Sequence, residues 1–306
     1  MKMPDDQAAS LRILAKEKNL GKQKLGFPES GGGPVVIAVT SGKGGVGKTS
    51  VVVNLGLLLA KQGVRTVLLD ADLGLANVEV LVGIVPPYSI YDVLYGDKTF
   101  QDILINGPFD LKIISGGSGL QELANIEQSQ RERLVNGLAF FQDKTEVLLI
   151  DTGAGISRNV LGFVAAAGEV IVVVTPEPTS LTDAYSLIKV LAKFKVHEKV
   201  FFIVNQASNE QEAILTAERI ILVTNKFLNN VKLKYLGFIL KEDIVVESVK
   251  NQNPFVIMHP NSQATKSLTQ IAVKLNNLIG RKDYSTDLKN SIGMKTFIQK
   301  LLKLYK

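Results

Sequence analysis

The sequence predicts an α/β fold in which a mostly parallel sheet is flanked by helices on both faces, with a helical tail at each end. Between residues 35 and 280, short apolar runs rich in β-branched residues alternate with helix-length amphipathic segments. This alternation is typical of strands joined by crossover helices. The runs at 35–39 and 170–174 are apolar throughout, which indicates strands buried on both faces.

The expected elements follow in order along the chain. Residues 1–20 predict a short amphipathic helix, with Asp5 or Asp6 as its N-cap. Residues 21–34 contain five glycines and two prolines, which is typical of a flexible linker. The body spans 35–280, and residues 281–306 hold a linker and a final helix. Strands are expected at 35–40, 66–70, 111–115, 147–151, 170–175, 200–205 and 235–240, and the main helices at 48–62, 128–141, 181–195, 210–229 and 262–279.

The net charge of +6 over 306 residues is concentrated at the two ends. Residues 1–30 hold six basic and four acidic side chains, and residues 281–306 hold seven and two. The rest of the chain is nearly neutral, so a broad nucleic-acid-binding face is not favoured. The chain has no cysteine, which excludes disulfides, thiolate-bound metal and thiol catalysis. No signal peptide is apparent, and we expect a cytoplasmic protein.

The glycine-rich segment 41–50 is the strongest functional motif. It follows an apolar strand and begins a helix, which is the context that a phosphate-binding loop requires. Backbone N–H groups and the helix N-terminus would bind phosphate oxygens. Lys48 would contact the β- and γ-phosphates, and Thr49 would ligate Mg²⁺. The sheet is therefore expected to be of the P-loop NTPase type, with nucleotide contacts from Gly42, Lys43, Gly44, Gly45, Val46, Gly47, Lys48, Thr49 and Ser50.

Two carboxylates fall where such a site needs them. Asp151 ends a buried strand and is expected to hold Mg²⁺, while Gly153 after it could sense a γ-phosphate. Asp72 closes another strand and could orient the attacking water. For Asp70, a role as a helix cap or turn residue is an equal alternative.

Three segments together resemble the MinD/ParA family of deviant Walker ATPases: KGGVGKT at 43–49, DADLGLAN at 70–77 and DTGAGIS at 151–157. The similarity covers about residues 34–280. In that family, the lysine equivalent to Lys43 reaches across a dimer interface to the partner's nucleotide, and ATP but not ADP holds the dimer. The resemblance implies an ATP-dependent homodimer whose catalytic residues are Lys43, Lys48 and Asp72.

The nucleotide base is expected to be adenine. The Asn-Lys-x-Asp motif of guanine-specific relatives does not occur in the sequence. Asn205 ends a predicted strand and matches the adenine-contacting asparagine of the family. Residues 241–255 resemble the family's second adenine-side loop and suggest Glu242 as a further contact. The implied ligands are ATP or ADP with Mg²⁺.

The N-terminal segment matches a second, more specific pattern. Residues 6–12 resemble the DQAxxLR pattern of the FlhG family (also YlxH or FleN), MinD-like regulators of flagellar number. In that family this segment stimulates the GTPase FlhF. An incidental amphipathic helix is the alternative. The residues implied in partner activation are Asp6, Gln7, Ala8, Leu11 and Arg12.

The final segment, 291–306, predicts an amphipathic helix with lysines beside its apolar face. At about 20 Å it is too short to span a bilayer, but it could lie on an anionic membrane surface. The alternative is a last helix packed on the body. The residues expected to contact the membrane are Met294, Phe297, Ile298, Leu301, Leu302 and Tyr305.

These patterns lead to one functional expectation and two alternatives. We expect an ATPase that regulates flagellar number and placement through FlhF and flagellar switch-ring proteins. It would be cytoplasmic and would associate peripherally with the inner face of the membrane when ATP-bound. A ParA-like ATPase that positions cargo on DNA is the first alternative. A metallochaperone or anion-pump ATPase is the second, and the lack of cysteine counts against it.

Overall fold

The computed structural model describes residues 33–72, 77–117, 126–280 and 293–304. Its strands form one eight-stranded sheet in the order β3-β4-β2-β5-β1-β6-β7-β8. All neighbouring strands pair in parallel except β3, which runs antiparallel to β4. The strands are β1 (Val35–Ser41), β2 (Thr66–Ala71), β3 (Leu104–Asn106), β4 (Lys112–Ser115), β5 (Val147–Ala154), β6 (Glu169–Val174), β7 (Lys199–Ala207) and β8 (Lys232–Leu240).

The predicted fold class is confirmed, and each predicted strand and main helix of the body is present. The edge strand β3 and four short helices (α3, α4, α9 and α10) were not expected, because segments of three to eight residues carry little periodicity. The N-terminal helix and its partner-activation residues lie outside the described residues.

The helices are α2 (Lys48–Lys61), α3 (Asn77–Val82), α4 (Ile90–Tyr95), α5 (Gln128–Ala139), α6 (Arg158–Ala166), α7 (Pro178–Lys193), α8 (Glu210–Phe227), α9 (Asp243–Lys250), α10 (Phe255–Met258), α11 (Gln263–Gly280) and α12 (Met294–Leu304).

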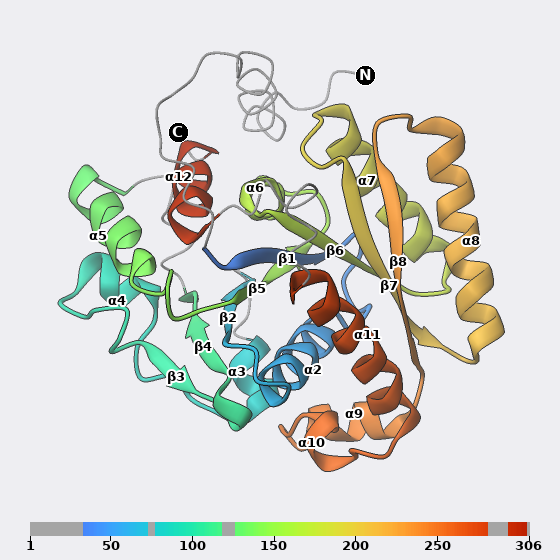
Figure 1. Cartoon of the computed structure of the whole chain (residues 1–306), viewed down its shortest axis with the longest axis horizontal. Coiled ribbons are helices and arrows are strands. Elements are labelled where there is room, and N and C mark those ends of the chain that lie inside the picture. Colours follow the sequence, from blue (N-terminus) through green and yellow to red (C-terminus); the bar gives the residue numbers. More distant parts are fainter. Residues whose placement is uncertain (1–32, 73–76, 118–125, 281–292, 305–306) are drawn as a thin grey trace.

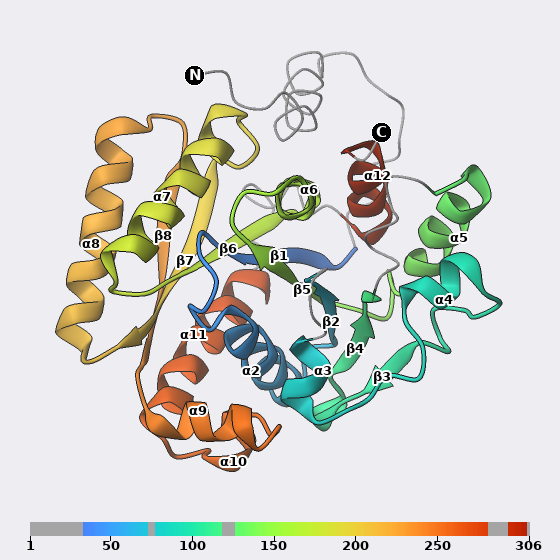
Figure 2. The ribbon, with the colours of Figure 1, turned by 180° about the vertical axis from the view of Figure 1, so that it is seen from behind.

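Helices cover both faces of the sheet, as Figures 1 and 2 show from opposite sides. Because side chains alternate along a strand, Val36 and Ala38 of β1 join the core under α5, α6, α7, α8 and α12. Ile37 and Val39 join the core under α2 and α11. Burial on both faces explains why this run is apolar throughout.

The parallel strands bring their carboxyl ends to a single edge of the sheet. The residues that follow β1, β2, β5, β6 and β7 therefore converge there. Two of the helices that start at this edge have clear local signals. Ser157 caps α6 by accepting from the Val160 amide at 3.4 Å, and Pro178 occupies the first turn of α7, where a missing N–H costs nothing.

Helix α12 packs on the body between α5 and α6 (Figure 1). Its apolar side chains Met294, Phe297, Ile298, Leu301 and Leu302 are all buried there. The structure thus shows the docked arrangement for these residues, and their predicted membrane contact requires the helix to leave this position. Tyr305 lies outside the described residues. Among the described helices, none is both long and apolar enough to cross a bilayer.

Candidate nucleotide site

The phosphate loop connects β1 to α2 at the carboxyl edge of the sheet. Gly45 and Gly47 adopt φ of 80° and 78°, a region that glycine enters without steric cost. The Ser41 hydroxyl donates to the Lys43 carbonyl at 2.9 Å. The Gly155 amide donates to the Ser41 carbonyl at 2.8 Å, so the loop is bonded to the segment that follows β5.

Lys48 at the start of α2 and Asp151 of β5 form a buried ion pair beside this loop. The Lys48 Nζ lies 2.6 Å from Asp151 Oδ1, and the two side chains are 7% and 0% exposed. Burial raises the pKa of Asp151, while the charge of Lys48 and hydrogen bonds from Lys48 and Thr49 oppose that rise. The other carboxylate oxygen, Oδ2, is buried without a hydrogen-bond partner among the described residues.

These groups fit a nucleotide with a divalent cation. The unpartnered Asp151 oxygen and the neighbouring Thr49 hydroxyl are hard oxygen donors, which Mg²⁺ prefers. Thr49 and Asp151 would hold the ion, and Lys48 would contact the phosphates. When bound, Mg²⁺ neutralises the negative charge on the phosphate oxygens.

The two aspartates at the end of β2, Asp70 within the strand and Asp72 just after it, make different contacts. Asp70 accepts from the backbone amides of Asp72 at 3.0 Å, Asn77 at 3.1 Å and Val78 at 3.2 Å. It therefore anchors the chain on both sides of residues 73–76, as the cap or turn interpretation predicted. Burial, reinforced by the charges of Glu79 and Asp151, raises the pKa of Asp70 to about 8.

The Asp72 carboxylate lies beside Gly153 of β5. A Cβ at Gly153 would lie 3.5 Å from Asp72 Oδ1, an ordinary van der Waals distance, which shows how close the carboxylate lies to this strand. The negative charge of Asp72 also raises the pKa of Asp151. The fold therefore places Asp72 near the Lys48–Asp151 pair, and its catalytic role stays a prediction.

Lys43 makes a different set of contacts. Its Nζ donates to Glu177 Oε2 at 2.8 Å and to Thr179 Oγ1 at 3.1 Å. Both partners lie where β6 leads into α7, and the Lys43 bond lowers the pKa of Glu177. Sequence reasoning missed Glu177 and Thr179; their position just after a predicted strand at the site edge was the available signal.

Gly42 explains why the loop approaches α7 so closely. A Cβ at Gly42 would lie 2.2 Å from the Asp183 carbonyl carbon and 2.4 Å from the Ala184 amide nitrogen. Any other residue would push the loop away from α7. The glycine therefore brings the Lys43 backbone against the helix whose first turn supplies its partners.

On the predicted adenine side, Asn205 and Gln206 at the end of β7 bond to the loop. Asn205 Nδ2 donates to the Val46 carbonyl at 2.8 Å, and Gln206 Nε2 donates to the Gly45 carbonyl at 3.4 Å. Gln206 has a φ of 59°, which is strained for a non-glycine residue. Because no sequence signal marks such a backbone, Gln206 was missed.

Glu242 lies just beyond β8, beside the end of β7. The Lys241 amide donates to the Ala207 carbonyl at 2.8 Å. The Glu242 carboxylate accepts from the Ala264 amide at 2.6 Å and so binds the N-terminal turn of α11. The adenine contacts of Asn205 and Glu242 stay predictions.

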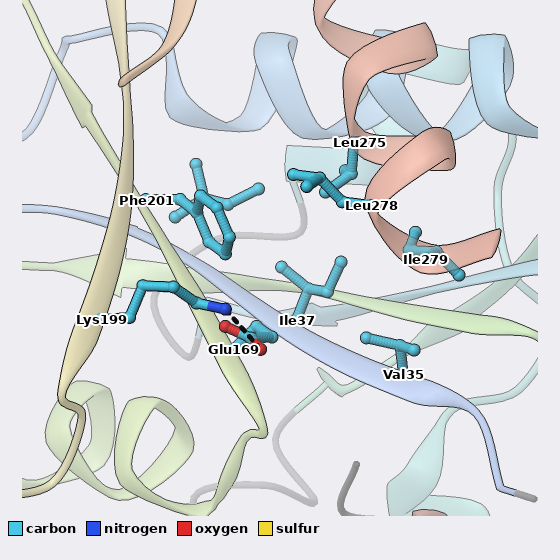
Figure 3. A pocket seen from close by; sticks show the side chains of 9 residues that line it. Val35, Ile37, Glu169, Lys199, Phe201, Leu275, Leu278 and Ile279 are labelled. Atoms are coloured by element: carbon cyan, nitrogen blue, oxygen red, sulfur yellow. Dashed lines mark hydrogen bonds and ion pairs between the residues drawn. The ribbon is translucent and has the colours of Figure 1, made fainter. Parts of the chain in front are cut away.

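A small apolar pocket lies at the opposite end of the sheet (Figure 3). Val35, Glu169 and Lys199 lie at the amino ends of β1, β6 and β7. Lys199 and Glu169 form an ion pair across 3.3 Å at this pocket. The pocket is therefore separate from the phosphate loop and is not the nucleotide site.

The site geometry defines a class of protein, the P-loop nucleotide hydrolases. Residues 37–255 match the model of the CobQ/CobB/MinD/ParA nucleotide binding domain. The chain belongs to this family, and the predicted MinD/ParA-type ATPase is confirmed.

Individual relatives refine this assignment. The chain is 41% identical over 242 residues to the antiactivator FleN of Pseudomonas aeruginosa, covering 79% of this chain and 86% of the relative. It is 32% identical to the flagellum site-determining protein YlxH of Helicobacter pylori, covering 98% and 99%. The predicted resemblance to the FlhG group is confirmed. A solved MinD from Pyrococcus horikoshii complexed with Mg-ADP shares the fold, with a TM-score of 0.65 and 24% identity, covering 81% and 98%.

Proposed function

We propose that this ATPase is a dimerising switch that binds an anionic membrane when ATP-bound and regulates flagellar number and placement. The main support for this proposal is that the two lysines of the phosphate-loop motif, Lys43 and Lys48, have different surroundings. Lys48 is buried against Asp151, whereas Lys43 is 39% exposed and bonded to Glu177. The flagellar names of two relatives, FleN and YlxH, support the cellular role.

Within one subunit, each group of the site has a distinct task. When nucleotide binds, the Lys48 ammonium leaves Asp151 and pairs with the phosphates. Thr49 and Asp151 then hold Mg²⁺, the ion that accompanies ADP in the Pyrococcus horikoshii MinD. Asp72 orients the attacking water. The Asn205 and Gln206 amides stabilise the loop carbonyls, which leaves the loop N–H groups for phosphate oxygens.

Lys43 is the group that we assign to the partner's nucleotide. Its ion pair with Glu177 is exposed, and solvent weakens such pairs. A triphosphate on a facing subunit offers more negative charge and would readily replace Glu177. Hydrolysis would then depend on dimerisation.

Mass measurement tests this assignment. Light scattering with an ATP analogue should give a dimer, and ADP should give a monomer. Lys43→Glu should abolish the dimer while leaving ADP binding intact. Lys266→Glu, a charge reversal at an exposed position on α11, is the matched control. A single mass in every nucleotide, unchanged by Lys43→Glu, would exclude the switch.

The membrane part of the proposal depends on α12. Six large apolar side chains, with Leu304 included, are buried in its docked position, and each contributes about 1.5–3 kcal/mol when removed from water. A lipid surface offers comparable burial and also attracts the lysines. Two helices in one ATP-bound dimer would bind more tightly than one through effective concentration.

We further propose two partners, a FlhF-type GTPase and flagellar switch-ring proteins. The alignment with YlxH, which spans 98% of this chain, supports a shared role for the terminal segments. A peptide of residues 1–30 should accelerate GTP hydrolysis by FlhF, and a peptide with Leu11 and Arg12 replaced by alanine should not. Equal rates with both peptides would contradict an activating role for this segment.

A further inference from the structure

We propose that Arg158 links the phosphate loop to the docked helix α12, so that the bound nucleotide decides whether the helix stays on the body. This inference rests on the proposed function, in which α12 is the membrane contact. It adds the residue through which the nucleotide site acts on that helix.

Two arginines bind the C-terminal end of α12. Arg131 Nη1 donates to the Leu302 carbonyl at 3.4 Å, and Arg158 Nη2 donates to the Leu304 carbonyl at 3.3 Å. The last carbonyls of a helix lack partners within it and carry the negative end of its dipole. Cationic donors at this end therefore favour the docked helix.

Only one of these arginines is adjacent in the sequence to a segment of the nucleotide site. Arg158 is the first residue of α6 and directly follows the segment 151–157 that begins with Asp151. Within that segment, the Gly155 amide bonds to Ser41 in the phosphate loop at 2.8 Å. Arg131 lies on α5, and its Nε donates to the Ile126 carbonyl at 3.4 Å within its own segment.

The position of Arg158 suits it to transmit a small displacement. A γ-phosphate would act on Gly153–Gly155, three to five residues before the arginine in the sequence. Because Arg158 is itself the first residue of α6, a shift of the α6 N-terminus would act directly on its bond to Leu304. The same shift would disturb the apolar packing, because α6 also contacts α12 directly.

The absence of cysteine allows a direct measurement in the full-length protein. Spin labels at Thr296→Cys on α12 and Asn136→Cys on α5, both exposed positions, report docking through their separation. Pulsed electron paramagnetic resonance is recorded without membranes, in ADP and in a non-hydrolysable ATP analogue. Dilution with unlabelled protein removes distances between subunits. The observable is the docked-to-released equilibrium constant in each nucleotide.

We expect the ATP analogue to release α12 in the otherwise unaltered protein. In Arg158→Gln, the ratio of the two equilibrium constants should fall towards one, and Arg158→Lys should restore part of it. Arg131→Gln is the matched control. It should weaken docking in both nucleotides by the same factor and leave the ratio unchanged.

Light scattering on the same samples separates the two levels of the proposal. If the unaltered protein does not dimerise with the ATP analogue, the proposed function is wrong. If it dimerises but α12 stays docked, the inference is wrong. The inference is also wrong if Arg158→Gln leaves the ratio intact or changes it no more than Arg131→Gln does.

Discussion

The phosphate-loop edge and the docked helix α12 are held on the same body by different forces. At the loop edge, polar groups at the ends of strands make short contacts, such as the 2.6 Å bond between Lys48 and Asp151. Helix α12 is held by buried apolar side chains, and the Arg131 and Arg158 bonds to its end are 3.4 and 3.3 Å long.

This difference indicates that the phosphate-loop edge stays in place, whereas helix α12 can detach from the body. The loop edge is also held by backbone bonds, such as the 2.8 Å bond from the Gly155 amide to the Ser41 carbonyl, so it keeps its architecture even when Lys48 turns from Asp151 to the phosphates. Apolar burial is non-directional, and a membrane surface can replace the face that α12 covers. We therefore expect substitutions at the loop edge to affect ATP hydrolysis, and changes to α12 to affect membrane binding.

The largest expected effect comes from Asp72→Ala, which removes the carboxylate that we assign to the attacking water. Hydrolysis should slow by about 10²–10⁴-fold, the usual contribution of a positioned acid or base. The variant should accumulate as an ATP-bound dimer. Single-turnover hydrolysis and light scattering measure both effects. Asp97→Ala, at a side chain that is 90% exposed, is the control, and hydrolysis by Asp72→Ala at the unmutated rate would reject this role.

A smaller effect is expected from deleting residues 291–306. Binding to anionic vesicles should fall by about tenfold or more, since each lysine contributes about 1 kcal/mol near such lipid. ATP-dependent dimerisation and ATP hydrolysis should persist, because no predicted nucleotide-site residue is removed. Co-sedimentation with anionic vesicles, neutral vesicles and DNA measures this. Retention on DNA, unaffected by the deletion, would favour the ParA-like alternative.

A third prediction concerns the pH dependence of unfolding at Asp70. Its pKa is raised from 3.8 to about 8, mainly by burial, so the folded protein binds this proton more tightly than the unfolded chain. The resulting stability is full below pH 3.8 and is lost as the pH rises through about 8.

Asp70→Asn mimics the protonated acid and should flatten that decline by up to about 1.4 kcal/mol per pH unit. Urea unfolding at several pH values between about 5 and 8 measures the slope. Asp97→Asn is the exposed control. Identical slopes in Asp70→Asn and the unaltered protein would contradict the raised pKa.

Much of the site could be predicted because its signals are local. The loop residues Gly42–Ser50 are adjacent in the sequence, and Asp72 and Asp151 each follow a run that reads as a strand. Glu177 could not be paired with Lys43, 134 residues away, because that contact depends on how α7 packs against the loop. Gln206 could not be predicted because a positive φ at a non-glycine residue leaves no pattern in the sequence.

By itself, the sequence determined the α/β class, the phosphate loop and the strand ends that hold its carboxylates, because periodicity and motif spacing act over short distances. The tertiary structure alone decided where α12 lies. An amphipathic helix has the same pattern whether its apolar face meets lipid or protein. Its docking on α5 and α6, and the bond from Arg158 to Leu304, arise from contacts between residues far apart in the chain.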